Sequence, residues 1–533
     1  MWSSPVVVTT GPVVVPSSQE FPLRTLLAAA LVVALPAVLA ASDGLPVKTP
    51  TSVGMSAARL ASIDRVVQRG IKAGGYPGAA VVVGRKGAAV WEKGYGSLGW
   101  DAASGRVTPD RTIYDLASLT KVIGTTTAIM VLYDEGRLRL EDPVVKYIPA
   151  FAGGYKDSVT IRHLLTHRSG LPAGRDLWRI SANPYQARQA VIETQLECKP
   201  GQCYIYSDLG ADMLGFIAET VSGQSLDTFL EEKVFHPLGM TDTFFKPADS
   251  LRARVAPTEV TPPRGYPLRG EVHDENAYAL GGVAGHAGLF STAADLSVFA
   301  QMMLNGGEYN GVRVLSDSVV HLFTQRAAGT RGLGWDTCNG DGGCGEHMSE
   351  RAYGHTGFTG TSIWIDPDRE MFVVLLTNRV HAARAKRPAK VISDIRADLS
   401  DAATAAVMDD PDNILAMPVS FRADRAEGWN PSARRAKSSR HATSRRGRAA
   451  RAARSGSRSK AKAKPSASGS RARSTTAKKA TTHSASGKRL KRTPASVAKK
   501  APTGSAAKSA TKSAVKRPAA KAATAKSKRR VHS

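Results

Sequence analysis

Two strand patterns that lie far apart in the chain constrain the fold most strongly. The stretch GAAVVVGRKGAAVWEKGYG, residues 78–96, reads as a hairpin that turns at Arg85-Lys86-Gly87. The stretch TSIWIDPDREMFVVLLTNRV, residues 361–380, reads as a second hairpin with its turn at 366–369. Because the chain between them is mostly short helices and loops, we expect one sheet built from both ends of a domain.

Helical periodicity predicts the helices that accompany this sheet. Residues 55–73 place Leu60, Ile63, Val67 and Ile71 on one face, with Ser56 as the expected N-cap. Further helices are expected at 210–223, 225–240, 295–307 and 388–407. The fold class is therefore α/β of the α+β type: an antiparallel sheet flanked by helices, with an inserted, mainly helical subdomain.

Charge divides the chain sharply. Residues 431–533 contain 32 Lys+Arg and no Asp or Glu, whereas the first 430 residues carry 41 Lys+Arg against 45 Asp+Glu, a net charge of −4. The basic segment has no Trp, Tyr or Phe, so it cannot bury enough apolar surface to offset chain entropy. We expect a folded domain at 50–408 and a linker with a disordered basic tail at 409–533. The tail either solubilises the protein or binds a polyanion.

An apolar run near the N-terminus indicates export. A basic residue precedes 18 uncharged, mostly apolar residues, and Val38-Leu39-Ala40 near their end fits a leader cleavage site. Pro36 disfavours a stable spanning helix, so we interpret residues 1–42 as a signal peptide. An uncleaved membrane anchor through 25–42 is the alternative.

The four cysteines fall into two local pairs, Cys198/Cys203 and Cys338/Cys344. An even count in an exported chain predicts two small disulfide loops. Neither pair has the Cys-x2-Cys spacing of zinc sites, and the sequence has no clustered histidine partners for them. We therefore expect two disulfides, no metal and no other cofactor.

Ser118 and Lys121 form the most informative polar pattern. Ser-x-x-Lys occurs six times in the lysine-rich tail, where composition makes it inevitable, but only once in the first 430 residues. There it precedes VIGTTTAIMVLYDEG, which predicts a buried helix. One helical turn places Lys121 on the face of Ser118. Burial and the helix N-terminus can lower the pKa of Lys121, so that it activates the hydroxyl as a nucleophile.

Two more elements follow in order along the chain. Tyr206-Ser207-Asp208 begins a helix, and His355-Thr356-Gly357 lies on or just before a strand. This order resembles the serine β-lactamase and penicillin-binding protein superfamily, and the tyrosine is similar to its class C β-lactamase, DD-carboxypeptidase and esterase branch. The stretches 161–172 and 281–300 also resemble that branch, so the resemblance covers roughly 50–400.

The resemblance implies a division of roles. Ser118 attacks a carbonyl and forms an acyl-enzyme, while Lys121 and Tyr206 share the work of the general base. The backbone N–H groups of Ser118 and Phe358 form the oxyanion hole. The resemblance also implies a substrate-binding group made of Asp208, His355, Thr356 and Gly357.

Two positions depart from the pattern of many relatives. Asp208 stands where an Asn is usual; its carboxylate is expected to raise the pKa of Lys121, and it can attract a substrate amine. His355 stands where many β-lactamases have Lys, and a neutral histidine attracts a β-lactam carboxylate less. Both favour peptidase or esterase chemistry over efficient β-lactam hydrolysis. We interpret three other histidines as structural: His163, His167 and His286.

The leading hypothesis is an exported, periplasmic or cell-envelope serine hydrolase. It acts on a peptidoglycan-related D-amino-acid peptide or a small ester and has weak or no β-lactamase activity. An efficient class C-like β-lactamase is one alternative, a polyanion- or nucleic-acid-binding protein acting through the tail is a second, and a catalytically inactive binding protein is a third. The leader disfavours chromosomal DNA and directs the tail to anionic envelope polymers or the membrane surface, while the intact serine, lysine and tyrosine disfavour an inactive fold.

Overall fold

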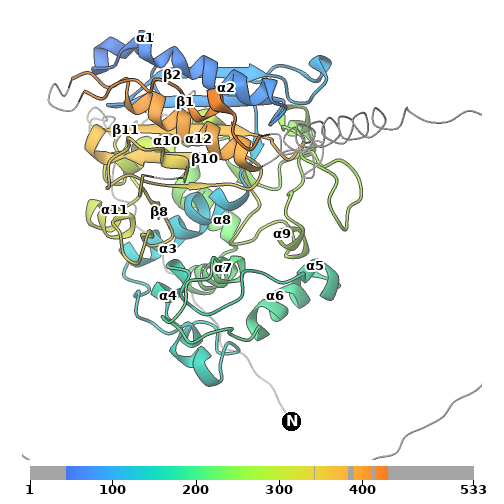
Figure 1. Ribbon diagram of the computed structural model, residues 1–533. Coiled ribbons are helices and arrows are strands. Elements are labelled where there is room, and N and C mark those ends of the chain that lie inside the picture. The colour runs from blue at the N-terminus through green and yellow to red at the C-terminus, as the bar shows by residue number, and fades with distance from the viewer. Residues whose placement is uncertain (1–43, 341, 382–388, 410–413, 430–533) are drawn as a thin grey trace, which may run out of the picture. The chain divides into compact units, whose positions relative to one another are not determined.

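A six-stranded antiparallel sheet joins the two ends of the domain (Figure 1). The computed structural model describes residues 44–340, 342–381, 389–409 and 414–429. In the order in which they pair, the strands are β2 (Ala88–Gly96), β1 (Gly78–Arg85), β11 (Met371–Thr377), β10 (Ser362–Asp366), β9 (Tyr353–Thr356) and β8 (Asp336–Thr337).

Both predicted hairpins are present, and each has a turn with left-handed residues. Lys86 (φ 48°) and Gly87 (φ 80°) join β1 to β2, the backbone signature of a two-residue hairpin turn. Glu370 (φ 50°) ends the turn between β10 and β11. Strands β1 and β11 pair directly, from Ala79 opposite Thr377, so the two hairpins form one sheet as expected.

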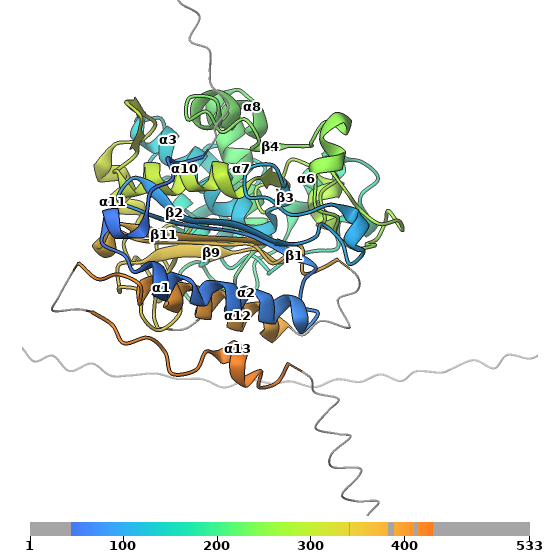
Figure 2. The same ribbon diagram turned by 90° about the horizontal axis from the view of Figure 1, so that it is seen from above.

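Helices cover both faces of this sheet (Figure 2). Alternate residues such as Val81 and Val83 of β1 face α2 (Ser62–Lys72) and α12 (Ala389–Thr404), while Val82 belongs to the core shared with α10 (Ala293–Leu304). Since both faces are covered, every residue of β1 and β11 is buried. This explains why these strands read as continuous apolar runs rather than as an alternating pattern.

The predicted helices appear with some corrections. The 55–73 helix is split into α1 (Ala57–Leu60) and α2, and Ser56 caps α1 by accepting a hydrogen bond from the Arg59 backbone N–H. The 225–240 helix consists of α8 (Leu226–Leu230) and a π-helical turn η7 (Glu231–Phe235), and it ends before Pro237, which cannot continue a helix. The other helices of the insertion and its surroundings are α3 (Thr127–Asp134), α4 (Ile161–Leu165), α5 (Leu177–Ile180), α6 (Pro184–Glu193), α7 (Asp208–Ser222), α9 (Glu275–Ala279) and α11 (Asp317–Thr324).

A small second sheet brings the chain before Ser118 to the 289–291 segment. Strand β3 (Tyr114–Asp115) pairs with β5 (Leu289–Ser291), which also pairs with β4 (Phe244–Phe245). This pairing places residues 244–245 and 289–291, which lie far along the sequence, next to the segment that precedes Ser118.

The folded chain continues past the expected boundary at 408. Phe421 and Trp429 are buried against the α2–α12 side of the sheet, and α13 (Arg422–Arg425) lies between them. Within the ranges that the structure describes, no helix is long and apolar enough to span a bilayer. The predicted leader and the basic tail from residue 430 onward lie outside the described residues.

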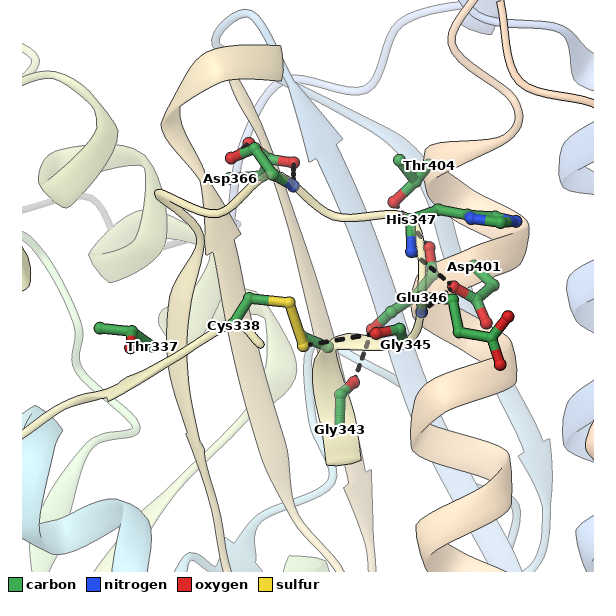
Figure 3. Close-up of a disulfide and its surroundings, with 12 residues drawn as sticks. Thr337, Cys338, Gly343, Gly345, Glu346, His347, Asp366, Asp401 and Thr404 are labelled. Atoms are coloured by element: carbon green, nitrogen blue, oxygen red, sulfur yellow. Dashed lines mark hydrogen bonds between the residues drawn. A yellow bond between two sulfur atoms is a disulfide. The ribbon is translucent and has the colours of Figure 1, made fainter. Parts of the chain in front are cut away.

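Both predicted cysteine pairs are bonded. Cys198–Cys203 closes a loop that leads into Tyr204, and Cys338–Cys344 closes a loop at the edge of the main sheet. Figure 3 shows the second disulfide beside α12, where Asp401 Oδ1 accepts hydrogen bonds from the backbone N–H groups of the two residues after Gly345 at 2.6 and 3.1 Å. The second disulfide therefore lies in a loop that α12 already holds.

Candidate active site

The nucleophile loop contains a left-handed residue directly before Ser118. Ala117 has φ 48°, which costs energy for a residue with a side chain, and its backbone N–H donates to Asp115 Oδ1 at 2.8 Å. Asp115 is buried, and its Oδ2 accepts from the His273 backbone N–H at 2.7 Å. Local strain held by a buried carboxylate is typical of functional loops, and the sequence alone did not indicate it.

The helix after Ser118 is not a regular α-helix. Ser118 lies in a 3-10 turn, η3 (Ala117–Leu119), which is followed by a π-helical segment η4 (Lys121–Thr126) and then by α3. The predicted single turn of α-helix between the serine and the lysine is therefore wrong in detail. Short π-helical segments are common at functional sites, and the lysine still reaches the serine.

Lys121 is buried, with 4% of its side chain exposed, and its ammonium group faces three oxygen atoms. Nζ lies 3.1 Å from Ser118 Oγ, 3.0 Å from the backbone carbonyl oxygen of His286 and 2.8 Å from Asp208 Oδ1. Burial disfavours the charge, but Asp208 and Tyr206 outweigh burial and raise the pKa of Lys121 above its usual value. The expectation that this helix start lowers the pKa of Lys121 is wrong, and the expectation that Asp208 raises it is confirmed.

The ring of Tyr206 joins the three sequence elements. Its centroid lies 4.6 Å from the ring centroid of His167 and 5.9 Å from that of His355, and Lys121 Nζ lies 5.1 Å from it. The fold thus brings Ser118, Lys121, Tyr206 and His355 into one cluster, as the resemblance implied.

Ser207 points away from this cluster. Its Oγ donates to the Pro172 carbonyl at 2.6 Å and accepts from the Gly210 N–H at 3.1 Å, so it caps helix α7. Its backbone N–H donates to His167 Nδ1 at 3.1 Å, which makes that nitrogen an acceptor. Burial and nearby cations hold the pKa of His167 well below its usual range, so His167 is a neutral, hydrogen-bonded support for the helix start.

Gly357 packs so closely on the nucleophile loop that a side chain would not fit. A Cβ atom there would lie 2.4 Å from the carbonyl oxygen of Leu116, which also accepts from Thr361 Oγ1 at 2.9 Å. The strand end that carries Phe358 is therefore held against the residues that precede Ser118. The oxyanion hole formed by the Ser118 and Phe358 backbone N–H groups stays a prediction.

Thr356, the last residue of β9, lines a polar cavity of about 300 Å³. Within the described residues, no hydrogen bond or ion pair joins its side chain to Ser118, Lys121 or Tyr206. Other residues that line this cavity are Asp336, Trp364 and Arg396. Thr356 thus lines this cavity, whereas Asp208 contacts Lys121 and His355 contacts Tyr206; the substrate-binding role of these residues stays a prediction.

His286 belongs to a charged cluster that the sequence did not reveal. Its Nδ1 lies 2.7 Å from Asp212 Oδ1 and its Nε2 lies 2.9 Å from Asp274 Oδ1. Ionised carboxylates only accept hydrogen bonds, so both ring nitrogens carry protons. Burial opposes this charge, but the two carboxylates raise the pKa of His286 well above its usual value. Since its carbonyl accepts from Lys121, the cluster directly supports the lysine.

We predict that His286→Gln lowers the free energy of unfolding by about 3 kcal/mol near pH 6, because it leaves two carboxylates without their buried partner. The folded-state pKa of His286 is raised, so the contribution of its charge is complete below the ordinary histidine pKa. That contribution is lost as pH rises through the folded-state pKa.

The difference in the free energy of unfolding between wild type and His286→Gln should therefore become smaller in alkaline solution, as measured by urea unfolding at several pH values. His321→Gln, a change at an exposed histidine of α11, is the control. A gap that stays constant from neutral to strongly alkaline pH contradicts the prediction.

A serine hydroxyl bonded to a buried lysine, with a tyrosine ring beside them at the junction of an antiparallel sheet and a helical insertion, defines a class of serine hydrolases. Residues 63–396, more than half of the chain, match the family model described as Beta-lactamase. The chain belongs to this family.

Curated relatives and solved structures agree with this assignment. A protein of Escherichia coli K12 named "Putative D-alanyl-D-alanine carboxypeptidase" is 36% identical over 372 residues, which cover 63% of this chain and 85% of the relative. A Salmonella schwarzengrund protein of the same name is 36% identical over 376 residues, 63% of this chain and 87% of the relative.

Two solved structures share the fold. A penicillin-binding protein homologue from Caulobacter crescentus aligns with a TM-score of 0.53 and 23% identity, over 66% of this chain and 99% of the homologue. The hydrolase EstCE1 aligns with a TM-score of 0.52 and 22% identity, over 65% of this chain and 99% of EstCE1. Together with the relatives, they place the chain among the serine hydrolases of the penicillin-binding protein and β-lactamase type.

Proposed function

We propose that this protein is an exported DD-carboxypeptidase-type hydrolase that removes a terminal D-amino acid from a peptidoglycan-related peptide through a Ser118 acyl-enzyme. The observation that carries the proposal is the contact of Ser118 Oγ with Lys121 Nζ at 3.1 Å, in a chain 36% identical to relatives that bear the carboxypeptidase name. Small esters are the second substrate class, because an acyl-enzyme forms from either bond.

In the proposed first step, Ser118 Oγ attacks the substrate carbonyl carbon and its proton passes to Tyr206, the proposed general base. Lys121 stays an ammonium group because Asp208 and the His286 carbonyl hold its charge, so it orients Oγ rather than removing the proton. The new C–O bond pushes the carbonyl electron pair onto oxygen, and the backbone N–H groups of Ser118 and Phe358 stabilise this oxyanion.

Collapse of the tetrahedral intermediate completes the cycle. The carbonyl re-forms, the bond to the leaving amine breaks, and Tyr206 returns its proton to that amine. A water molecule then attacks the acyl-enzyme with Tyr206 as the base, the acid is released, and Ser118 regains its proton. The steps need no metal or redox partner.

The environment of Asp208 and His355 favours a peptide or ester over a β-lactam. Asp208 is about one-third exposed. Its carboxylate can therefore attract an amine on the substrate in addition to binding Lys121. Burial, together with Arg331 and Lys121, holds the pKa of His355 well below its usual range. His355 therefore contributes no positive charge toward a β-lactam carboxylate.

The proposal is tested with the full-length protein on three substrates: a peptide ending in D-Ala-D-Ala, a chromogenic cephalosporin and a short aryl ester. We expect turnover of the peptide and the ester that exceeds turnover of the cephalosporin by at least about 10²-fold in kcat/KM, or about 2.7 kcal/mol of differential barrier. Efficient cephalosporin turnover with none of the peptide would replace the proposal with the β-lactamase alternative.

Asp208→Asn should change the ratio of peptide to cephalosporin turnover by at least about tenfold, or about 1.4 kcal/mol. The substitution keeps the size of the side chain but removes the charge that lies 2.8 Å from Lys121 Nζ. Asp176→Asn, at an exposed position outside the cluster, is the matched control. An unchanged ratio would show that Asp208 does not select the substrate.

The proposal includes export and attachment to the cell envelope. Residues 431–533 carry 32 positive charges without acidic residues, and a chain that leaves the cytoplasm meets envelope polymers and lipid head groups rather than chromosomal DNA. Attachment through charge alone should weaken with added salt, because exposed charges are screened within about 8 Å at physiological ionic strength.

We predict that fractionated cells hold the full chain on the envelope at low salt and release it in a salt wash, while a variant ending at residue 430 is already soluble. A variant with the tail sequence shuffled at fixed composition is the control and should behave like the full chain. If the truncated form stays envelope-bound, the tail is not the anchor. If the full chain is found on the nucleoid, the nucleic-acid alternative replaces export.

A further inference from the structure

Arg331 places a buried positive charge against the ring of Tyr206. Its guanidinium carbon lies 5.3 Å from the Tyr206 ring centroid and 5.8 Å from that of Tyr204, and 8% of its side chain is exposed. Cations pack favourably on the faces of aromatic rings, more so away from water. Arg331 comes from a loop more than a hundred residues beyond Tyr206, and no sequence pattern singled it out.

The guanidinium is held in one orientation from two sides. Nε donates to the Tyr204 hydroxyl at 3.0 Å, and Nη2 forms an ion pair with Asp336 Oδ1 at 2.8 Å. The Arg331 backbone is fixed too, because its N–H donates to the Ala328 carbonyl at 3.0 Å. Nη1 is buried and has no hydrogen-bond partner among the described residues. A buried guanidinium with two anchors can orient the ring on which it packs.

The second histidine beside Tyr206 does not supply this charge. His355 Nδ1 lies 2.9 Å from the Thr356 carbonyl oxygen, which only accepts, so Nδ1 carries the proton. Its Nε2 is buried, without a hydrogen bond among the described residues, and 4.0 Å from Asp336 Oδ2. His355 is therefore neutral, and Arg331 supplies a positive charge beside the tyrosine.

We infer that Arg331 is a positioning residue for Tyr206, whose guanidinium both fixes the phenol ring and attracts its oxygen when that oxygen is charged. The inference rests on the proposed role of Tyr206 as the base. The other groups around the ring are the Lys121 ammonium and the neutral rings of His167 and His355, with Asp208 neutralised by Lys121. Among the described residues, Arg331 and Lys121 are the two cations that pack on the phenol ring.

The test compares Arg331→Gln and Arg331→Lys with Arg326→Gln in the full-length protein. Arg326 lies in the same segment and is exposed, and its guanidinium donates to Thr337 Oγ1 and to the Cys338 carbonyl, so its replacement removes a hydrogen-bonded guanidinium away from Tyr206. On an aryl ester, we expect Arg331→Gln to lower kcat by about 10²-fold with KM changed by less than about threefold.

A purely structural role would not move the pH profile, so the profile is the second readout. The acid limb of the kcat profile should move to higher pH in Arg331→Gln, because a cation beside the proposed base favours its charged form and the variant lacks that cation. Arg331→Lys should restore about tenfold of the activity, and methylguanidinium should partly rescue Arg331→Ala. Arg326→Gln should keep the wild-type profile.

Two outcomes overturn the inference: a wild-type kcat and pH profile in Arg331→Gln, or an equal loss in Arg326→Gln. If Arg331→Gln does not fold, as judged by thermal unfolding, Tyr204→Phe decides. This variant keeps the charge but removes the Nε acceptor, and it should lower kcat by about three- to tenfold; no loss overturns the inference. Turnover that persists in Ser118→Ala defeats the proposed function instead, so the two failures are distinguishable.

Discussion

Ser118→Ala should abolish covalent labelling and lower turnover by at least about 10⁴-fold, because the proposed acyl-enzyme forms on Ser118 Oγ. The Ser118 side chain is only partly buried, and Lys121 keeps its contacts with Asp208 and the His286 carbonyl. The free energy of unfolding should therefore change by less than about 1 kcal/mol. Intact-mass spectrometry after treatment with a fluorophosphonate should show one adduct on the wild type and none on the variant.

Ser222→Ala is the control for this measurement. Ser222 ends helix α7, and its hydroxyl bonds locally to the Gln224 backbone, so the variant should label and turn over like the wild type. An adduct that persists in Ser118→Ala would show that another residue is the nucleophile.

Tyr206→Phe should lower kcat by about 10²–10⁴-fold with little change in KM, since it removes the proton acceptor and keeps the ring. The ring contacts with His167 and His355 remain, so the loss reports on the hydroxyl and not on packing. Steady-state kinetics on the aryl ester measures the effect, and Tyr185→Phe, at a tyrosine that is 71% exposed, is the control.

The contrary result would reassign the base. If Tyr206→Phe keeps more than about a tenth of the activity while Lys121→Met is inactive, then the lysine removes the proton. That outcome would require Lys121 to lose its charge during the reaction, against the pull of Asp208.

Several parts of the fold could be predicted because their causes are local. The β1–β2 and β10–β11 hairpins follow from apolar runs separated by turn residues, and their pairing follows from the order of elements along the chain. The cysteine pairs are five and six residues apart, close enough for spacing alone to indicate each partner. The prediction of a regular helix after Ser118 was wrong, because the strained Ala117 and the π-helical segment depend on contacts with Asp115 and the rest of the site.

The sequence by itself determined which residues carry the chemistry: a single Ser-x-x-Lys outside the tail, a tyrosine at a helix start and a His-Thr-Gly strand. Only the tertiary structure decided how these groups are charged. Lys121 keeps its proton because Asp208 and the His286 carbonyl converge on it, and Arg331 reaches Tyr206 from another loop. Sequence patterns record periodicity over a few residues, whereas the charge state of a buried group depends on every group that folding brings within a few ångströms.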